Sequence, residues 1–88
     1  MEKQYGNSYQ VRKAAGLYWI LKMDQVGQSY VEPLPVNQVG ADIFGLLQEG
    51  NTSQEIAKEL SLKYGAPEDV IEEDVLAFLE QLKERGFN

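Results

Sequence analysis

Hydrophobic and polar positions alternate over the first third of the chain in the way that is typical of β-strands. Residues 9–14 alternate between two faces, and residues 17–23 form an aromatic and β-branched run that is apolar on both. After a glycine-containing turn at residues 24–28, a third extended run covers residues 29–36. We therefore expect a three-stranded antiparallel sheet in which the second strand is central.

From residue 37 onward, apolar positions recur with helical spacing, and three helices are expected. Each begins beside a residue suited to a helix N-terminus and ends at a glycine. They run from Asn37 to Gly50, from Thr52 to Gly65 and from Pro67 to Gly86. The order predicts an α+β fold that resembles a winged helix-turn-helix with its strands first. One domain over residues 9–88 would follow a flexible polar arm over residues 1–8.

The composition excludes several classes of function. The chain has 88 residues and contains neither cysteine nor histidine. It therefore lacks disulfides, thiolate metal sites and the commonest general base and metal ligand. No apolar run approaches the roughly 20 residues that span a bilayer, and the N-terminus has no signal-peptide pattern. We expect a cytoplasmic, non-catalytic protein without a cofactor, a metal or a membrane partner.

Charge is distributed unevenly along the chain. The net charge is −6, but residues 37–88 carry four basic and eleven acidic side chains, a balance of −7. The acidic residues of the third helix indicate a solvated helix face and not a calcium loop, which would need a central glycine. A DNA-recognition helix would need basic or amide side chains instead. We expect no nucleic-acid partner, although a winged-helix DNA-binding regulator stays an alternative.

The third extended run contains Pro33 and Pro35, which cannot donate to a strand ladder. If this strand pairs through its even-numbered residues, both prolines face an open edge. A mildly apolar strip of the third helix consists of Val70, Asp74, Ala77 and Gln81. The edge and this strip could together hold an extended peptide. Two other interpretations stay open at this point: an edge protected by its prolines, and a homodimer formed through it.

Three segments of the chain carry motifs that occur together in one family. They are PVNQVGADIFGLL at residues 35–47, GNTSQEIA at residues 50–57, and EEDVLAFLEQL at residues 72–82, which RGF follows at residues 85–87. Each motif alone is a combination of capping residues and apolar spacing that occurs in many unrelated helices. Their order and spacing resemble the PqqD-like family, and the resemblance extends over residues 17–88.

This resemblance implies a module that recognises the leader of a ribosomally made precursor peptide. In the family, the leader adds to the third strand and packs against the third helix, while a partner enzyme such as a radical SAM protein modifies the peptide. The strand side falls on Tyr30, Val31, Glu32 and Leu34, and the helical wall on Val70, Asp74, Ala77 and Phe78. The two prolines depart from the family pattern and would confine strand addition to residues 29–32. The alternative within this picture is a structural subunit of a larger enzyme.

Overall fold

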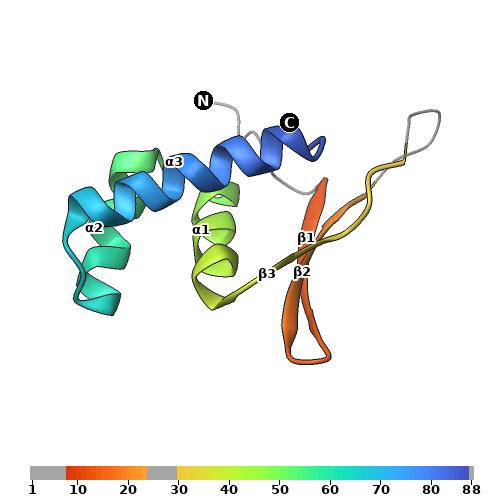
Figure 1. Ribbon diagram of the computed structural model, residues 1–88, viewed down its shortest axis with the longest axis horizontal. Coiled ribbons are helices and arrows are strands. Elements are labelled where there is room, and N and C mark those ends of the chain that lie inside the picture. The colour runs from red at the N-terminus through yellow and green to blue at the C-terminus, as the bar shows by residue number, and fades with distance from the viewer. Residues whose placement is uncertain (1–7, 24–29, 88) are drawn as a thin grey trace.

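The computed structural model describes residues 8–23 and 30–87 (Figure 1). Residues 1–7 of the expected arm over residues 1–8, and the expected turn over residues 24–28, lie outside the described residues. The elements are β1 (Tyr9–Ala14), β2 (Leu17–Lys22), β3 (Leu34–Val36), α1 (Gln38–Gln48), α2 (Ser53–Tyr64) and α3 (Glu68–Glu84). The predicted α+β order of three strands and then three helices is confirmed.

The sheet is antiparallel with the strand order β1-β2-β3, so β2 is central as expected. A two-residue turn joins β1 to β2, with φ of 55° at Ala15 and 78° at Gly16. Positive φ at both residues defines a type I′ turn, whose twist matches the twist of the strands. Beyond the other end of the hairpin, the amide of Met23 donates to the carbonyl of Ser8 at 2.7 Å.

β3 pairs with β2 through its even-numbered residues, which is the register that leaves Pro35 facing the open edge. Leu34 lies opposite Ile20 and Val36 opposite Tyr18, while Pro35 takes the position between them. The strand is shorter than the expected run, because Leu34–Val36 alone belongs to the ladder and residues 30–33 do not. The ladder with β2 therefore ends at Leu34, directly after Pro33.

The helix termini follow the predicted capping. The side chain of Asn37 accepts a hydrogen bond from the amide of Gly40 at 2.8 Å. Thr52 and Glu55 form the reciprocal capping box, at 3.1 and 2.8 Å. Pro67 occupies the N-cap of α3, one position before the first helical turn where it was expected.

The core lies where the inner face of the sheet meets the helices. α1 packs on β2 and β3. α3 runs along α2 and over α1 toward the first residue of β1, Tyr9 (Figure 1). Phe87, which is fully buried just after α3, donates its amide to the carbonyl of Leu82 at 2.8 Å. Its ring lies 5.7 Å from that of Tyr9 on β1, centroid to centroid. The C-terminal end of α3 is thereby held against the sheet.

Candidate functional site

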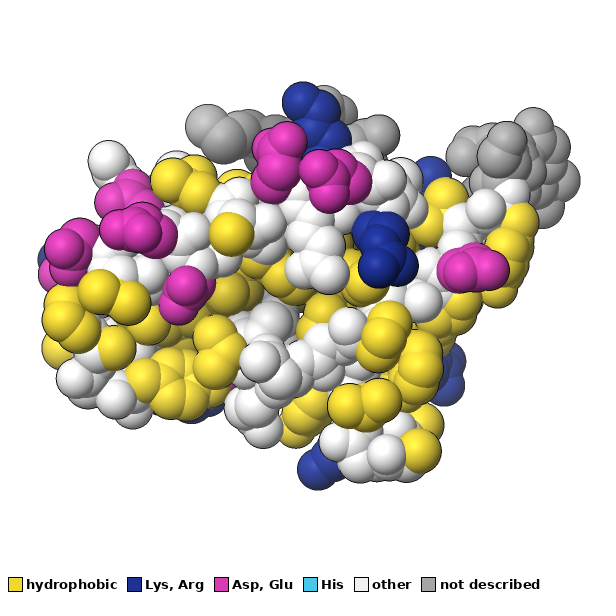
Figure 2. Space-filling model, viewed as in Figure 1, with side chains coloured by type: hydrophobic (Ala, Val, Ile, Leu, Met, Phe, Trp, Pro, Cys, Tyr) yellow, Lys and Arg dark blue, Asp and Glu magenta, His cyan; other side chains and the backbone are white. Residues whose placement is uncertain are grey.

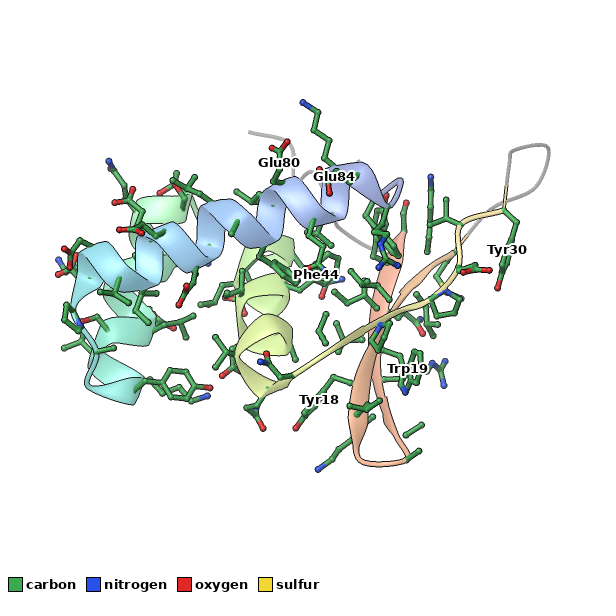
Figure 3. The ribbon with its side chains drawn as sticks, viewed as in Figure 1. Tyr18, Trp19, Tyr30, Phe44, Glu80 and Glu84 are labelled. Carbon is green, nitrogen blue, oxygen red and sulfur yellow. The ribbon has the colours of Figure 1, made fainter. Side chains whose placement is uncertain are left out.

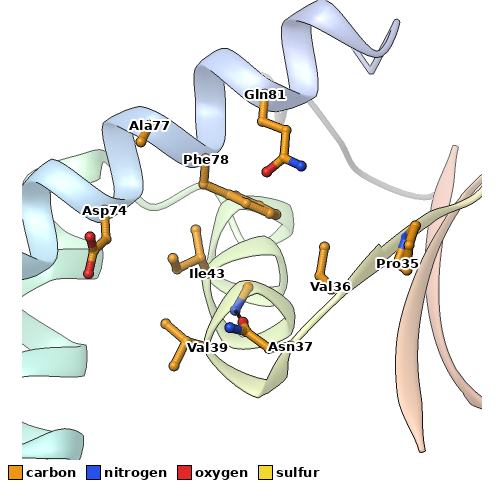
Figure 4. Close-up of a pocket in the computed structure, with 10 residues that line it drawn as sticks. Pro35, Val36, Asn37, Val39, Ile43, Asp74, Ala77, Phe78 and Gln81 are labelled. Atoms are coloured by element: carbon orange, nitrogen blue, oxygen red, sulfur yellow. Dashed lines mark hydrogen bonds between the residues drawn. The ribbon is translucent and has the colours of Figure 1, made fainter.

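A groove of about 530 Å³ opens between β3, α1 and α3 (Figure 4). Three short stretches of the chain line it: the end of β3 with its link to α1, the first two turns of α1, and the middle of α3. The lining residues are Pro35, Val36, Asn37, Val39, Gly40, Ile43, Asp74, Ala77, Phe78 and Gln81. Apolar side chains and polar groups thus share the surface of the groove, with polar side chains at Asn37, Asp74 and Gln81.

Gly40 allows the walls of the groove to approach one another. A Cβ at this position would lie 3.0 Å from the Cβ of Val36 and 3.4 Å from Cε1 of Phe78. Such a separation from Val36 is closer than ordinary van der Waals contact between carbons, which begins near 3.5 Å. The absence of a side chain at Gly40 therefore sets how closely α1 packs against β3 and α3.

The outer edge of β3 presents backbone hydrogen-bonding groups beside this groove. Leu34 and Val36 direct their amides and carbonyls toward β2, since Pro35 has no N–H and must take the unbonded position. The peptide bonds are trans, so the carbonyl of Pro35 and the amide of Asn37 point to the opposite side. No hydrogen bond from residues 8–23 or 30–87 reaches either group. One acceptor and one donor are therefore available along the groove.

A polar network holds α1 in place behind the groove. Tyr18 on β2 donates to Gln38 at 2.9 Å, and Gln38 in turn donates to Asp42 at 3.4 Å. Asp42 also accepts hydrogen bonds from Tyr64 and from Lys63, the latter at 3.0 Å. Partial burial raises the pKa of the Asp42 carboxyl, but the hydrogen bonds from Tyr64, Lys63 and Gln38 outweigh it and hold that pKa below its usual value.

Three of the four predicted wall residues line the groove. They are Asp74, Ala77 and Phe78, and Gln81 of the same predicted helical strip joins them. Val70 is 47% exposed and lies outside the groove lining, one turn nearer the start of α3. Helical spacing therefore identified the groove-facing side of α3 from Asp74 onward.

The four predicted strand residues are dispersed. Leu34 is 2% exposed, with its side chain in the core, and Val31 packs beside Gly86 after α3. Tyr30 and Glu32 line a second hollow of about 520 Å³ on the outer face of the sheet. The hollow's other lining residues are Arg12, Ala14, Trp19, Leu21 and Pro33. Figure 3 shows Trp19 and Tyr30 pointing away from the helices. The side chains of Tyr30 and Glu32 thus lie apart from the groove.

Sequence reasoning missed the contribution of α1 to the groove. The helical spacing of apolar positions predicts only that Val39 and Ile43 belong to the buried face of the helix, and Asn37 is predicted only as its N-cap. The feature that indicates this contribution is the single-residue link between β3, which ends at Val36, and α1, which begins at Gln38. So short a link places the first turns of the helix directly beside the end of the strand.

The helical side of the groove is acidic along most of α3. Figure 2 shows Asp and Glu side chains along α3, Lys or Arg side chains toward its C-terminal end, and hydrophobic side chains over much of the sheet. Within the described ranges, no group of three or more acidic side chains is arranged to hold a metal ion. None of the helices in the described part of the chain has the length and hydrophobicity needed to cross a bilayer.

The fold and the family of this chain are shared with known proteins, although no curated protein matches it. The structure of "TbiB1 in Complex with the TbiA(beta) Leader Peptide" superposes with a TM-score of 0.71 and 22% identity, covering 94% of this chain and 91% of that one. "Lasso peptide synthetase B1 complexed with the leader peptide" gives the same TM-score and identity, with 91% and 88% covered. The fold is therefore shared with both structures. The family described as Coenzyme PQQ synthesis protein D (PqqD) matches residues 22–87, and the chain belongs to this family.

Proposed function

We propose that this protein binds the leader segment of a ribosomally made precursor peptide and presents the peptide to a separate modifying enzyme. The observation that carries the proposal is the groove, which the open edge of β3 borders on one side and α3 on the other. An extended peptide fits such a site by β-augmentation, in which backbone bonds give affinity and side-chain contacts give specificity.

Each side of the groove has its own part in this mode of binding. The carbonyl of Pro35 and the amide of Asn37 would bond the peptide backbone. Ala77 and Phe78 on α3 would receive its side chains, together with the apolar residues of α1. Among the predicted strand residues, Leu34 would act indirectly, because its buried side chain fixes β3 in the core. Both structural neighbours were determined with a leader peptide, which supports the same use of this fold.

The residues before β3 extend the proposed site. Tyr30, Val31 and Glu32 precede the strand and would meet a peptide that continues past its end. Val70 would meet a peptide that continues along α3 in the other direction, since it lies one turn before Asp74. A segment longer than the groove itself would therefore be needed to reach all the predicted residues.

The proposed role is one of positioning, without chemistry. Among residues 8–23 and 30–87, Asp74 is the only charged side chain that lines the groove, and the sequence contains no histidine or cysteine, so these residues offer no nucleophile–base pair there. Holding the leader raises the effective concentration of the rest of the peptide at the enzyme. We place this event in the cytoplasm, where ribosomes make such peptides, with a radical SAM protein as one candidate enzyme.

Blocking the groove tests the proposal. Ala77 is exposed inside the groove, whereas its neighbour Leu76 is 52% exposed outside it. The probe is the synthetic leader of the precursor peptide encoded nearest to this gene, titrated by calorimetry. We expect wild-type binding at micromolar affinity, about −8 kcal/mol. Ala77→Trp should weaken binding at least tenfold, while Leu76→Trp should leave it nearly unchanged.

The outcomes separate this proposal from its rivals. Equal affinities of the two tryptophan variants would contradict binding in the groove. Co-purification with an enzyme in the absence of any peptide would favour a structural subunit. A dimer through the open edge of β3 would occupy the same backbone groups, so leader binding should convert it to monomer in size-exclusion chromatography. The acidic exposed side of α3 disfavours DNA binding.

A further inference from the structure

Asp74 brings an uncompensated negative charge to an otherwise uncharged groove. It lies on the groove-facing side of α3 (Figure 4), and its carboxylate has no ion-pair or hydrogen-bond partner within residues 8–23 and 30–87. The helix positions three and four residues away on either side are Val70, Ile71, Ala77 and Phe78, none of which is basic. The charge is therefore available to a ligand that enters the groove.

The spacing along α3 relates this charge to the apolar surface next to it. Asp74 and Phe78 are four residues apart, which is a rise of about 6 Å along the helix. In an extended peptide, residues i and i+2 point to the same side and lie about 6.6 Å apart. β3 and α3 border the same groove and slope in the same direction in Figure 4, where Asp74 lies beyond the end of β3 and Phe78 lies nearer to Val36. Two same-side residues of one bound strand would thus meet Asp74 and Phe78 together.

We propose that Asp74 makes the groove selective for peptides that carry a lysine or arginine two positions from a large apolar residue. The inference rests on the proposed function and specifies the class of leader that the groove accepts. A basic side chain pairs with the carboxylate of Asp74, while the apolar side chain packs on Phe78. The other end of the groove, at Gln81, is neutral and adds no charge preference.

The net charge of −6 could attract basic peptides without any specific contact, and a matched variant separates the two effects. Glu73 is the adjacent residue of α3, is exposed, and does not line the groove. Asp74→Asn and Glu73→Gln each remove one negative charge from neighbouring positions. Long-range attraction is therefore nearly equal in the two variants, and only Asp74→Asn changes the groove.

The test is a selection from random decapeptides displayed on phage, performed on immobilised wild-type, Asp74→Asn and Glu73→Gln proteins. We expect wild-type and Glu73→Gln pools to share basic residues two positions from an apolar one. The Asp74→Asn pool should keep the apolar preference and lose the basic one. A synthetic peptide from the wild-type pool should bind Asp74→Asn about 2- to 5-fold more weakly, as for an exposed ion pair. Its Lys→Gln version should bind wild-type and Asp74→Asn equally.

Each contrary result has a distinct meaning. An Asp74→Asn pool as rich in lysine and arginine as the wild-type pool would overturn the inference while leaving peptide binding in place. Equal loss of the basic preference in Glu73→Gln would also overturn it, since general acidity would then explain the preference. Enrichment of no peptide by any of the three proteins would refute the proposed function, and the inference with it.

Discussion

Gly40 and Gly45 lie on the same helix, α1, but differ in what surrounds them. A Cβ at Gly40 would lie 3.0 Å from the Cβ of Val36, whereas a Cβ at Gly45 would have nothing within 4 Å. Replacing glycine by alanine in a helix gains up to about 1 kcal/mol from backbone propensity at either position. The difference between the two variants therefore measures the cost of the contact at Gly40 alone.

The expected magnitudes follow from this comparison. Gly45→Ala should raise the free energy of unfolding by about 0.5–1 kcal/mol. In Gly40→Ala, the same gain is set against an overpacking cost of about 1–3 kcal/mol, because Val36 and Phe78 must move apart. The net result is a loss of about 0–2.5 kcal/mol. For a domain of this size, 1 kcal/mol corresponds to about 4–8 °C in Tm, so the two variants should differ by at least about 4 °C.

Thermal and urea unfolding monitored by circular dichroism provide the measurement, and peptide titration provides a second. Gly40→Ala should also weaken peptide binding, since the methyl group would stand between two walls of the groove, while Gly45→Ala should bind normally. If Gly40→Ala stabilised the protein as much as Gly45→Ala, the close packing of α1 on β3 would not be a constraint. The account of how the groove is shaped would then be refuted.

Two further variants test the hairpin and the polar network. Ala15→Asn should raise the free energy of unfolding by about 1 kcal/mol, because asparagine tolerates the left-handed conformation of Ala15 better than alanine does; an unchanged Tm would contradict the type I′ turn. Asp42→Asn should destabilise the protein at pH 7. The lowered pKa of Asp42 gives a stabilisation that is present above the unfolded value near 4 and is lost as the pH falls through the folded value. The difference in unfolding free energy between wild type and variant, measured by urea unfolding, should therefore narrow as the pH falls below about 4, and a constant difference would contradict the network.

Local rules predicted the elements because their signals are short-range. Asn37 and the pair Thr52 and Glu55 form the caps that their spacing indicated, and the helical period placed Asp74 and Ala77 on one face. The same rules could not predict what lies opposite that face. The distance from α3 to β3 depends on contacts between residues far apart in sequence, which no local pattern specifies.

The strand side of the site shows more clearly what local sequence patterns cannot predict. The family resemblance implied that Tyr30 and Glu32 belong to the binding strand, within an expected run over residues 29–36, but the ladder ends at Leu34. Their side chains lie with Trp19 on the outer face of the sheet. A proline-containing segment can leave the pleat without any change in its hydrophobic pattern, so its direction could not be read from composition.

The walls of the groove are each anchored away from the groove itself. Phe87 packs on Tyr9 and holds the end of α3 to β1, and the bonds of Asp42 hold α1 to α2. Leu34 holds β3 in the core. None of these contacts uses the carbonyl of Pro35 or the amide of Asn37, so a peptide can pair with the edge without breaking a bond among the described residues. Because the site is formed before the peptide arrives, ordering costs fall mainly on the peptide, and a short strand with one or two side-chain contacts suffices for micromolar affinity.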